Sequence, residues 1–236
     1  MTLRIDGPRI LPVKGKAEQL VVLCHGYGAD GNDLIGLAPY FQELMPNAVF
    51  VAPNAPMRCD MSPYGYQWFP ISRMNPEETL KGVQAAAPIL ESFIADELKR
   101  HELDGTRLAL VGFSQGTMMS LHVGLRRAQT PAAILGFSGA LVGRQLLAGE
   151  TTSRPPILLV HGDRDEMIPL SALHKAVEAL SEAGLAVQWH VSPGVGHGID
   201  PTGLTLGATF LADAFAGRLK VAGIAGPEAG SPSTPS

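Results

Sequence analysis

The chain has 236 residues, of which 45% are hydrophobic, so one sizeable domain with a substantial core is expected. A formal net charge of −4 and the lack of any Lys/Arg run argue against nucleic acid as a partner. No stretch approaches the ~18 uninterrupted apolar residues of a membrane-spanning helix, and residues 1–11 lack the apolar core of a signal peptide. Two cysteines are too few for a disulfide framework, so a location in the reducing cytoplasm is expected.

Apolar runs, which predict buried strands, alternate along the chain with amphipathic stretches, which predict helices. This alternation indicates an α/β fold, with a mostly parallel central sheet and helices on both of its faces. Residues 3–11 are predicted to form an edge strand or hairpin. Further strands are predicted at residues 19–24, 48–52, 107–112, 132–137, 156–161 and 187–191. Helices are predicted at residues 32–44, 75–100 with a kink at Pro88, 117–127, 171–183 between a Ser171 cap and Gly184, and 202–219.

Two segments fit neither pattern. Residues 57–73 are rich in aromatic and other apolar side chains without a helical or strand period. A long loop in a compact domain is usually functional, and this one either borders a substrate pocket or packs its aromatic side chains into the core. Residues 222–236 are rich in Gly, Pro, Ser and Ala, which predicts a disordered tail. We therefore expect a single domain over residues 1–221, followed by that tail.

The most informative motif is Gly112-Phe113-Ser114-Gln115-Gly116, which joins a predicted strand to a predicted helix. In this context Gly-x-Ser-x-Gly is typical of a nucleophile elbow, a strained turn that presents the serine hydroxyl. The pentapeptide alone is weak evidence, because a chain with 27 glycines also forms such a pattern by chance. The flanking strand and helix favour the elbow over an incidental turn.

A serine nucleophile needs a base and a carboxylate that orients the base. In α/β-hydrolases these residues follow in the order Ser, acid, His. His197 lies in a glycine-rich loop after the last predicted strand, where a mobile imidazole is expected; the alternative is a loop histidine bonded to backbone. The remaining histidines after the serine are less suited, because they lie in predicted elements or precede every candidate acid: His122, His161, His174 and His190.

The acid is expected on the loop after the predicted strand at 156–161. Position alone leaves Asp163, Asp165 and Glu166 open, and any of them could instead be a turn or cap residue. The oxyanion of an acyl-transfer intermediate also needs N–H donors. One is expected from the backbone of Gln115, at the start of a predicted helix. The other is expected from the loop His25-Gly26-Tyr27-Gly28, which is otherwise a simple connection between strand and helix.

Five motifs appear together in one order: Leu23-Cys24-His25-Gly26-Tyr27-Gly28 with Asp33, Tyr66-Gln67-Trp68-Phe69, Gly112-Phe113-Ser114-Gln115-Gly116, His161-Gly162-Asp163-Arg164-Asp165-Glu166-Met167-Ile168-Pro169 and Gly196-His197-Gly198. With them the chain resembles the carboxylesterase/phospholipase family of α/β-hydrolases, which includes acyl-protein thioesterases. The resemblance covers nearly all of residues 19–215. Each motif is weak alone, whereas together they are highly specific.

The resemblance implies a role for each matched residue. Ser114 would be the nucleophile, Asp165 the orienting acid in preference to Asp163, and His197 the base. The oxyanion N–H groups would come from Tyr27 and Gln115, and the acyl pocket would be bordered by Trp68 and Phe69. The chain departs from the family pattern in two places, where Pro70 follows Trp-Phe and Thr117 follows the elbow. Both departures affect the expected pocket shape, so no acyl-chain preference is implied.

The expected function is therefore hydrolysis of carboxylic esters or thioesters through an acyl-enzyme on Ser114, on a small or lipid-like acyl substrate. A lysophospholipase or an acyl-protein thioesterase is an open alternative, and a binding protein that keeps the fold without turnover is a remote one. No cofactor is expected, and no cluster in the sequence has metal-ligand spacing. The sequence leaves a homodimer open.

Overall fold

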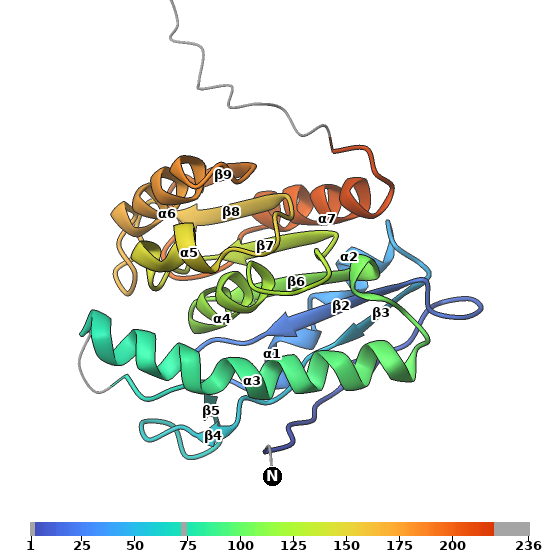
Figure 1. Cartoon of the computed structure of the whole chain (residues 1–236). Coiled ribbons are helices and arrows are strands. Elements are labelled where there is room, and N and C mark those ends of the chain that lie inside the picture. Colours follow the sequence, from blue (N-terminus) through green and yellow to red (C-terminus); the bar gives the residue numbers. More distant parts are fainter. Residues whose placement is uncertain (1–2, 72–74, 220–236) are drawn as a thin grey trace, which may run out of the picture.

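A seven-stranded sheet forms the centre of the computed structural model, which describes residues 3–71 and 75–219 (Figure 1). Its strands lie in the order β1-β3-β2-β6-β7-β8-β9. β1 pairs antiparallel with β3, and every other neighbouring pair is parallel. The strands are β1 (Arg9–Ile10), β2 (Gln19–Cys24), β3 (Ala48–Val51), β6 (Leu108–Phe113), β7 (Ala133–Phe137), β8 (Ile157–Gly162) and β9 (Val187–Ser192).

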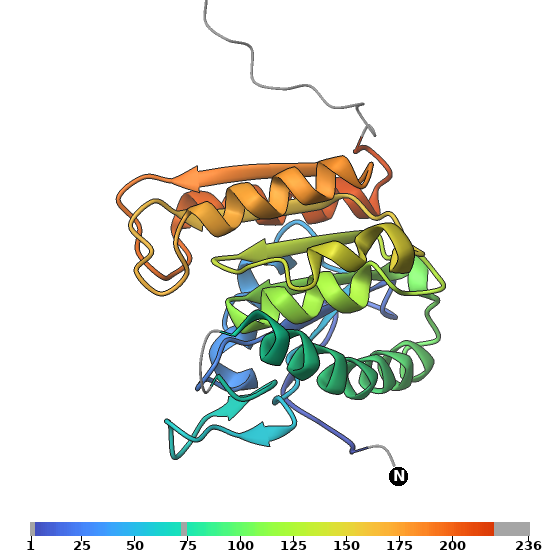
Figure 2. The same ribbon diagram turned by 60° about the vertical axis from the view of Figure 1, so that its left-hand side comes forward.

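Helices cover both faces of this sheet. One face carries α3 (Pro76–Arg100), α4 (Gln115–Gly124), α5 (Leu147–Glu150) and α6 (Ser171–Glu182). The other carries α1 (Gly31–Ile35), α2 (Ala38–Gln42) and α7 (Pro201–Phe215). Short 3-10 turns cover Gly105–Arg107 and Arg144–Leu146. In Figure 2, α3, α4 and α6 all lie in front of the sheet, in teal, green and orange.

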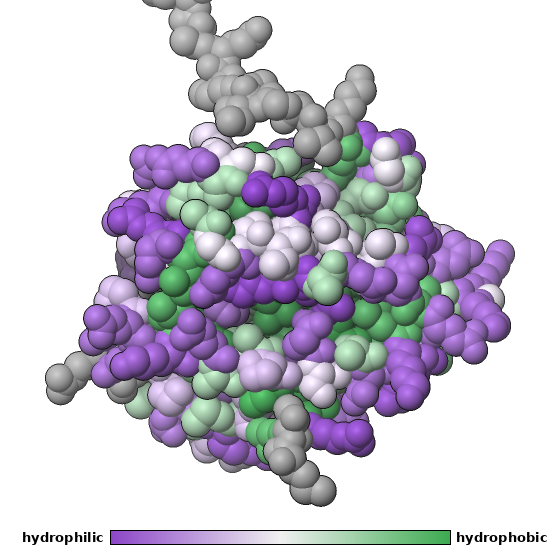
Figure 3. Space-filling model, in the orientation of Figure 1, coloured by the Kyte–Doolittle hydropathy of each residue, from purple (hydrophilic) through white to green (hydrophobic). Residues whose placement is uncertain are grey.

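The two helical layers exist because the strands are apolar on both faces. In β2, Leu20 and Val22 pack into the core cluster shared with α3 and α4, whereas Val21 and Leu23 pack into the cluster shared with α7. All four side chains are fully buried. A parallel sheet buried on both faces requires such continuous apolar runs. Figure 3 shows mainly hydrophilic residues on one outer face, with smaller apolar areas between them.

The predicted α/β fold with a mostly parallel sheet and helices on both faces is confirmed. All six apolar runs are strands, with ends within one residue of those predicted, and the N-terminal stretch contributes the edge strand β1. None of the helices among the described residues combines the length and the apolar character needed to cross a membrane. Residues 222–236 lie outside the described part, so their disorder stays a prediction.

The helices predicted to end at 127 and 219 end earlier, α4 at Gly124 and α7 at Phe215. Three other local predictions were wrong. The helix expected at 32–44 is two short helices, because Gly36 caps the end of α1 and Pro39 lies in the first turn of α2. The cap of α6 is Leu170 without a side-chain bond, and Ser171 is already helical. Segment 57–73, expected to be irregular, contains an antiparallel hairpin of β4 (Met57–Arg58) and β5 (Tyr66–Gln67); its last two residues lie outside the described part.

The parallel strands place their carboxyl ends at a common edge of the sheet. The loops that follow β2, β6, β8 and β9 therefore open on the same side of the molecule. In open α/β sheets this edge is where ligands usually bind. All of the predicted site residues other than Trp68 and Phe69 follow one of these four strands.

Candidate active site

Ser114 lies in the sharp turn between β6 and α4. Its φ of 54° and ψ of −116° fall outside the conformations that non-glycine residues ordinarily adopt. Two glycines make this turn sterically feasible. A Cβ at Gly112 would overlap the backbone of Gly116, and a Cβ at Gly116 would overlap the carbonyl oxygen of Cys24. The turn can therefore pack against the end of β2 only when both positions lack a side chain.

Thr117, one of the departures from the family pattern, ties this turn to the sheet. Its hydroxyl lies 2.8 Å from the carbonyl oxygen of Gly112 and 2.9 Å from that of Phe137. The backbone N–H of Ser114 donates to the same Phe137 oxygen at 2.9 Å. The turn is thus anchored to the ends of both β6 and β7.

Asp165 and His197 meet although they lie on different loops, after β8 and after β9. His197 Nδ1 is 2.8 Å from Asp165 Oδ2, and the aspartate side chain is fully buried. Asp165 Oδ1 accepts the backbone N–H groups of Met167 and Ile168 at 2.9 and 2.8 Å. Burial alone raises the pKa of Asp165, but the hydrogen bonds from Ile168 and His197 outweigh burial and lower this pKa below its ordinary value. Asp165 is therefore a carboxylate near neutral pH, and the Nδ1 that faces it is the protonated nitrogen of His197.

The two other acids that the sequence left open make no bond to His197 in the described part of the chain. Asp163 instead accepts the backbone N–H of Gly194 at 2.6 Å, and so ties the loop of His197 to the end of β8. Glu166 is exposed to solvent.

His197 also lies beside the turn of Ser114. Its ring centroid is 4.9 Å from the centroid of Phe113, which immediately precedes the serine. Among residues 3–71 and 75–219, no hydrogen bond joins the Ser114 hydroxyl to the imidazole. Catalytic hydrogen bonds of this kind often tighten only in the complex with substrate.

Two of the other candidate histidines lie in helices. His122 is buried within α4, where desolvation lowers its pKa to about 4, and His174 lies in α6 against Trp189. His161, at the end of β8, lies beside the candidate acid. Its Nε2 is 3.3 Å from the same Asp165 oxygen that His197 contacts.

The loop after β2 lies against the serine turn, since a Cβ at Gly26 would stand 3.3 Å from the Cβ of Ser114. His25 holds this loop from within the core. Its Nδ1 is 2.7 Å from the carbonyl oxygen of Gly26, and its Nε2 accepts the backbone N–H of Ala55 at 2.9 Å. Burial lowers the pKa of His25, so the imidazole is neutral and Nδ1 is its donor.

The backbone N–H groups of Tyr27 and Gln115 make no hydrogen bond within the described residues. The N–H of Gln115 belongs to the first turn of α4, where such groups lack a helical partner and the helix dipole favours negative charge. Both donors therefore lack a partner among these residues, and their role as an oxyanion hole is taken up below as a proposal.

The side chain of Gln115 has a contact role that its sequence position did not reveal. Its Oε1 accepts the backbone N–H of Trp68, and its Nε2 donates to the carbonyl oxygen of Phe69, each at 2.8 Å. Trp68 and Phe69 are only 1% and 2% exposed, and the Trp68 indole donates to the carbonyl oxygen of His25 at 3.0 Å. This burial favours the alternative in which the loop packs its aromatic side chains into the core, and their role at an acyl pocket stays a prediction.

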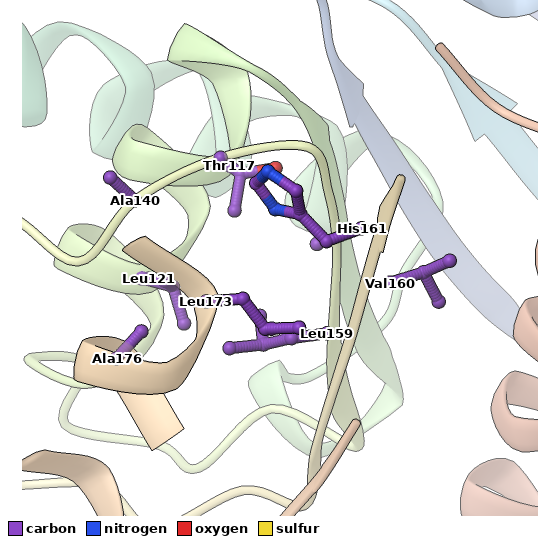
Figure 4. A pocket seen from close by; sticks show the side chains of 10 residues that line it. Thr117, Leu121, Ala140, Leu159, Val160, His161, Leu173 and Ala176 are labelled. Atoms are coloured by element: carbon purple, nitrogen blue, oxygen red, sulfur yellow. The ribbon is translucent and has the colours of Figure 1, made fainter. Parts of the chain in front are cut away.

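A small cavity lies behind the serine turn, between α4, α6 and the ends of β7 and β8 (Figure 4). It offers about 10 Å³ of room for the centre of a water molecule, which is close to the least that one water needs. Thr117 and His161 form its polar wall, and the other lining residues are apolar or glycine. The cavity is too small for an acyl chain. Within the described residues, no three His, Cys, Asp or Glu side chains gather closely enough to hold a metal ion.

Sequence reasoning missed the side chains that fix the loop of His197. The Ser138 hydroxyl donates to the carbonyl oxygen of Gly198 at 3.3 Å. The Ser192 hydroxyl donates to Asp200 Oδ1 at 2.6 Å, and Asp200 also caps α7. A cap before Pro201 was a readable signal for Asp200. The partners of the two serines lie on other segments, and no local pattern marks them.

Comparisons with known proteins identify the family of the chain. The sequence model of the Phospholipase/Carboxylesterase family matches residues 5–214. The chain belongs to the phospholipase/carboxylesterase family. The crystal structure of esterase PE8 superimposes with a TM-score of 0.86 at 41% identity, covering 89% of this chain and 99% of that one.

Two curated proteins are more distant relatives of this phospholipase/carboxylesterase family member. Acyl-protein thioesterase 1 of Gibberella zeae is 25% identical over 221 residues, covering 86% of this chain and 94% of that protein. Esterase YpfH of Escherichia coli is 28% identical over 184 residues, covering 78% of each chain. The resemblance inferred from the motifs is thereby confirmed.

Proposed function

We propose that this protein hydrolyses carboxylic esters or thioesters through an acyl-enzyme on Ser114. The observation that carries the proposal is the 2.8 Å contact between His197 and the buried Asp165, formed beside the strained turn of Ser114. An imidazole oriented by a buried carboxylate can activate an adjacent hydroxyl. Membership of a family whose named relatives are esterases and thioesterases supports the same reaction class.

Acylation begins when Nε2 of His197 takes the hydroxyl proton of Ser114 as the serine oxygen attacks the acyl carbonyl. The carbonyl oxygen becomes an oxyanion, and the free N–H groups of Tyr27 and Gln115 stabilise it. The tetrahedral intermediate collapses, the bond to the alcohol or thiol breaks, and His197 returns the proton to that leaving group. Water then attacks the acyl-enzyme by the same route, which releases the carboxylic acid and restores the serine.

Asp165 contributes to both halves by fixing the imidazole. Its Oδ2 accepts a hydrogen bond from the Nδ1–H of His197. The Nε2 of the same ring is then unprotonated and can act as base. When His197 gains the serine proton, the buried carboxylate also stabilises the imidazolium. The two backbone N–H groups on Oδ1 keep Asp165 ionised during this cycle.

The cavity behind the serine turn is too small for an acyl chain, so we place the acyl group in front of the turn. The β4–β5 hairpin is a candidate border. Its Tyr66 exchanges backbone hydrogen bonds with Gly28 and Ala29, next to the loop of Tyr27, at 2.9 and 2.8 Å. Near its tip, Met61 and Tyr64 are 84% and 85% exposed.

Lysophospholipids and acylated proteins are alternative substrates to simple esters. A panel of esters and thioesters of graded chain length discriminates among them.

The test is the Ser114→Ala variant. Loss of a triad nucleophile can lower kcat on the order of a millionfold, whereas removing one hydroxyl from the turn deletes little packing. We expect an essentially inactive protein with the wild-type melting temperature. Ser171→Ala, at the exposed start of α6, is the matched control and should keep full activity. A tenth of wild-type activity in Ser114→Ala would refute the proposal, and no activity in the wild type on any ester or thioester would favour a binding protein.

A further inference from the structure

His161 is a buried polar residue that the proposed mechanism does not use. It stands near the end of β8 with 1% of its surface exposed. Its Nε2 is 2.8 Å from the carbonyl oxygen of Ile168 and 3.3 Å from Oδ2 of Asp165. Both neighbours are acceptors, so Nε2 is the nitrogen that carries a hydrogen in the neutral ring.

These contacts connect His161 to the candidate acid through the 165–168 turn. Ile168 donates its N–H to Asp165 Oδ1, while its carbonyl oxygen accepts from His161, which also reaches Asp165 Oδ2. With His197 on Oδ2 and Met167 on Oδ1, the buried carboxylate accepts three hydrogen bonds, and Nε2 of His161 lies 3.3 Å from Oδ2 while its hydrogen bond goes to Ile168. The carboxylate therefore cannot rotate away from His197 without breaking several hydrogen bonds inside the protein.

We propose that His161 is a positioning residue that holds Asp165 in the rotamer that orients His197. The inference rests on the proposed function, because it matters only if Asp165 acts through His197. The N–H of His161 fixes the 165–168 turn through the carbonyl oxygen of Ile168, and the N–H of the same residue is bonded to Oδ1 of Asp165. The effect is expected on turnover, since no contact of His161 reaches the front of the serine turn where substrate binds.

A purely packing role is the rival explanation, because His161 also lines the small cavity behind the turn together with Thr117 (Figure 4). The two explanations differ in what a replacement side chain must supply. Positioning requires an N–H at the place of Nε2, whereas packing requires only a side chain of similar volume.

A matched pair of amides separates them. The amide nitrogen of glutamine reaches as far from the backbone as Nε2 of histidine, whereas that of asparagine reaches only as far as Nδ1. We expect His161→Gln to keep kcat within about 3-fold of wild type. We expect His161→Asn to lower kcat about 10-fold, with KM changed less than about 3-fold, as for the loss of one buried hydrogen bond that orients Asp165. His161→Leu should show the same loss, and thermal melting checks that each variant is folded.

A double-mutant cycle with Asp165→Asn gives the decisive result. If His161 acts through Asp165, His161→Asn should cost less than about 3-fold once Asp165→Asn is present. Equal losses in both backgrounds, or equal activity of the Gln and Asn variants at position 161, would overturn the positioning role alone. A harmless Asp165→Asn would instead overturn the proposed function on which the inference rests. If His161→Asn does not fold, the cycle is run with His161→Leu, and a loss of kcat in His161→Gln as large as in His161→Leu also overturns the inference.

Discussion

The turn that carries Ser114 and the loop that carries His197 are shaped by different forces. The turn is steric: Gly112 and Gly116 allow its backbone to pack against β2 where any Cβ would overlap another chain segment. The loop passes close to Gly162, where a Cβ would overlap the carbonyl oxygen of Val195, but polar side chains from other segments also hold it, including Asp163 on Gly194 and Ser138 on Gly198. A glycine in this loop, Gly198, has open space where its Cβ would be. The serine turn is thus encoded in five consecutive residues, whereas the loop of His197 depends on residues spread along the chain.

The largest expected effect separates two carboxylates near this loop. Asp165→Asn should lower kcat roughly 10⁴-fold, because an amide no longer selects the tautomer of His197 that can accept a proton; that magnitude is the one known for the corresponding change in a serine protease. Asp163→Asn should lower kcat by less than about 10-fold, since an amide oxygen can still accept the N–H of Gly194. Steady-state kinetics of the two variants decide this, and a greater loss in Asp163→Asn would show that the wrong acid is assigned.

The steric requirement for glycine in the turn of Ser114 is tested by adding one methyl group. Gly116→Ala should lower the free energy of unfolding by about 3 kcal/mol, because its Cβ would overlap the backbone of Cys24, which cannot move away. Gly198→Ala, with no atom near its Cβ, should change stability by less than about 0.5 kcal/mol. Urea unfolding measures both values. Similar losses of unfolding free energy in the two variants would contradict the view that glycine is required for steric reasons in the turn of Ser114 and not at position 198.

The stability that hydrogen bonds give to the loop of His197 should depend on pH, whereas the stability of the turn of Ser114 should not. Burial raises the pKa of Asp200, but hydrogen bonds from Ser192 and from the first turn of α7 outweigh it and lower the pKa below 3.8. The folded protein thus binds this proton less readily than the unfolded chain does. The stabilisation is complete above pH ~3.8 and is lost as the pH falls through the folded pKa.

Asp200→Asn should therefore cost about 1 kcal/mol of unfolding free energy at pH 7, the usual worth of a charge-assisted bond near a helix cap. That cost should shrink as the pH falls below 3.8. The cost of Gly116→Ala is the control and should stay constant over the same range. A cost of Asp200→Asn that does not change with pH would mean that the carboxylate charge is not what holds the loop.

The same contrast explains how much of the molecule could be predicted from the sequence. Strands were placed well because apolar runs such as Gln19–Cys24 are buried on both faces and carry their own signal. The motif around Ser114 could be recognised because both of its glycines are required by backbone that lies too close for a side chain. Gly36 and Pro39 were also local signals that α1 and α2 are separate helices, although the apolar period suggested one helix.

The hydrogen bonds that hold the loop of His197 could not be predicted, because each joins residues far apart in the chain. Ser138 and Gly198 are 60 residues apart, and Asp163 and Gly194 are 31 apart. Position left Asp163, Asp165 and Glu166 equivalent, and the motif resemblance alone favoured Asp165. Which carboxylate faces His197 depends on how the loops after β8 and β9 fold over each other. The burial of Trp68 likewise depends on its distant partners His25 and Gln115.

The most direct test of the account is to identify the residue that a serine-directed fluorophosphonate modifies in the native protein. Peptide mapping by mass spectrometry should find the label on Ser114 alone, with no labelling in Ser114→Ala and much slower labelling when His197 is replaced by Ala. Labelling of a different serine, or equal labelling rates with and without His197, would contradict a nucleophile at Ser114 activated by His197.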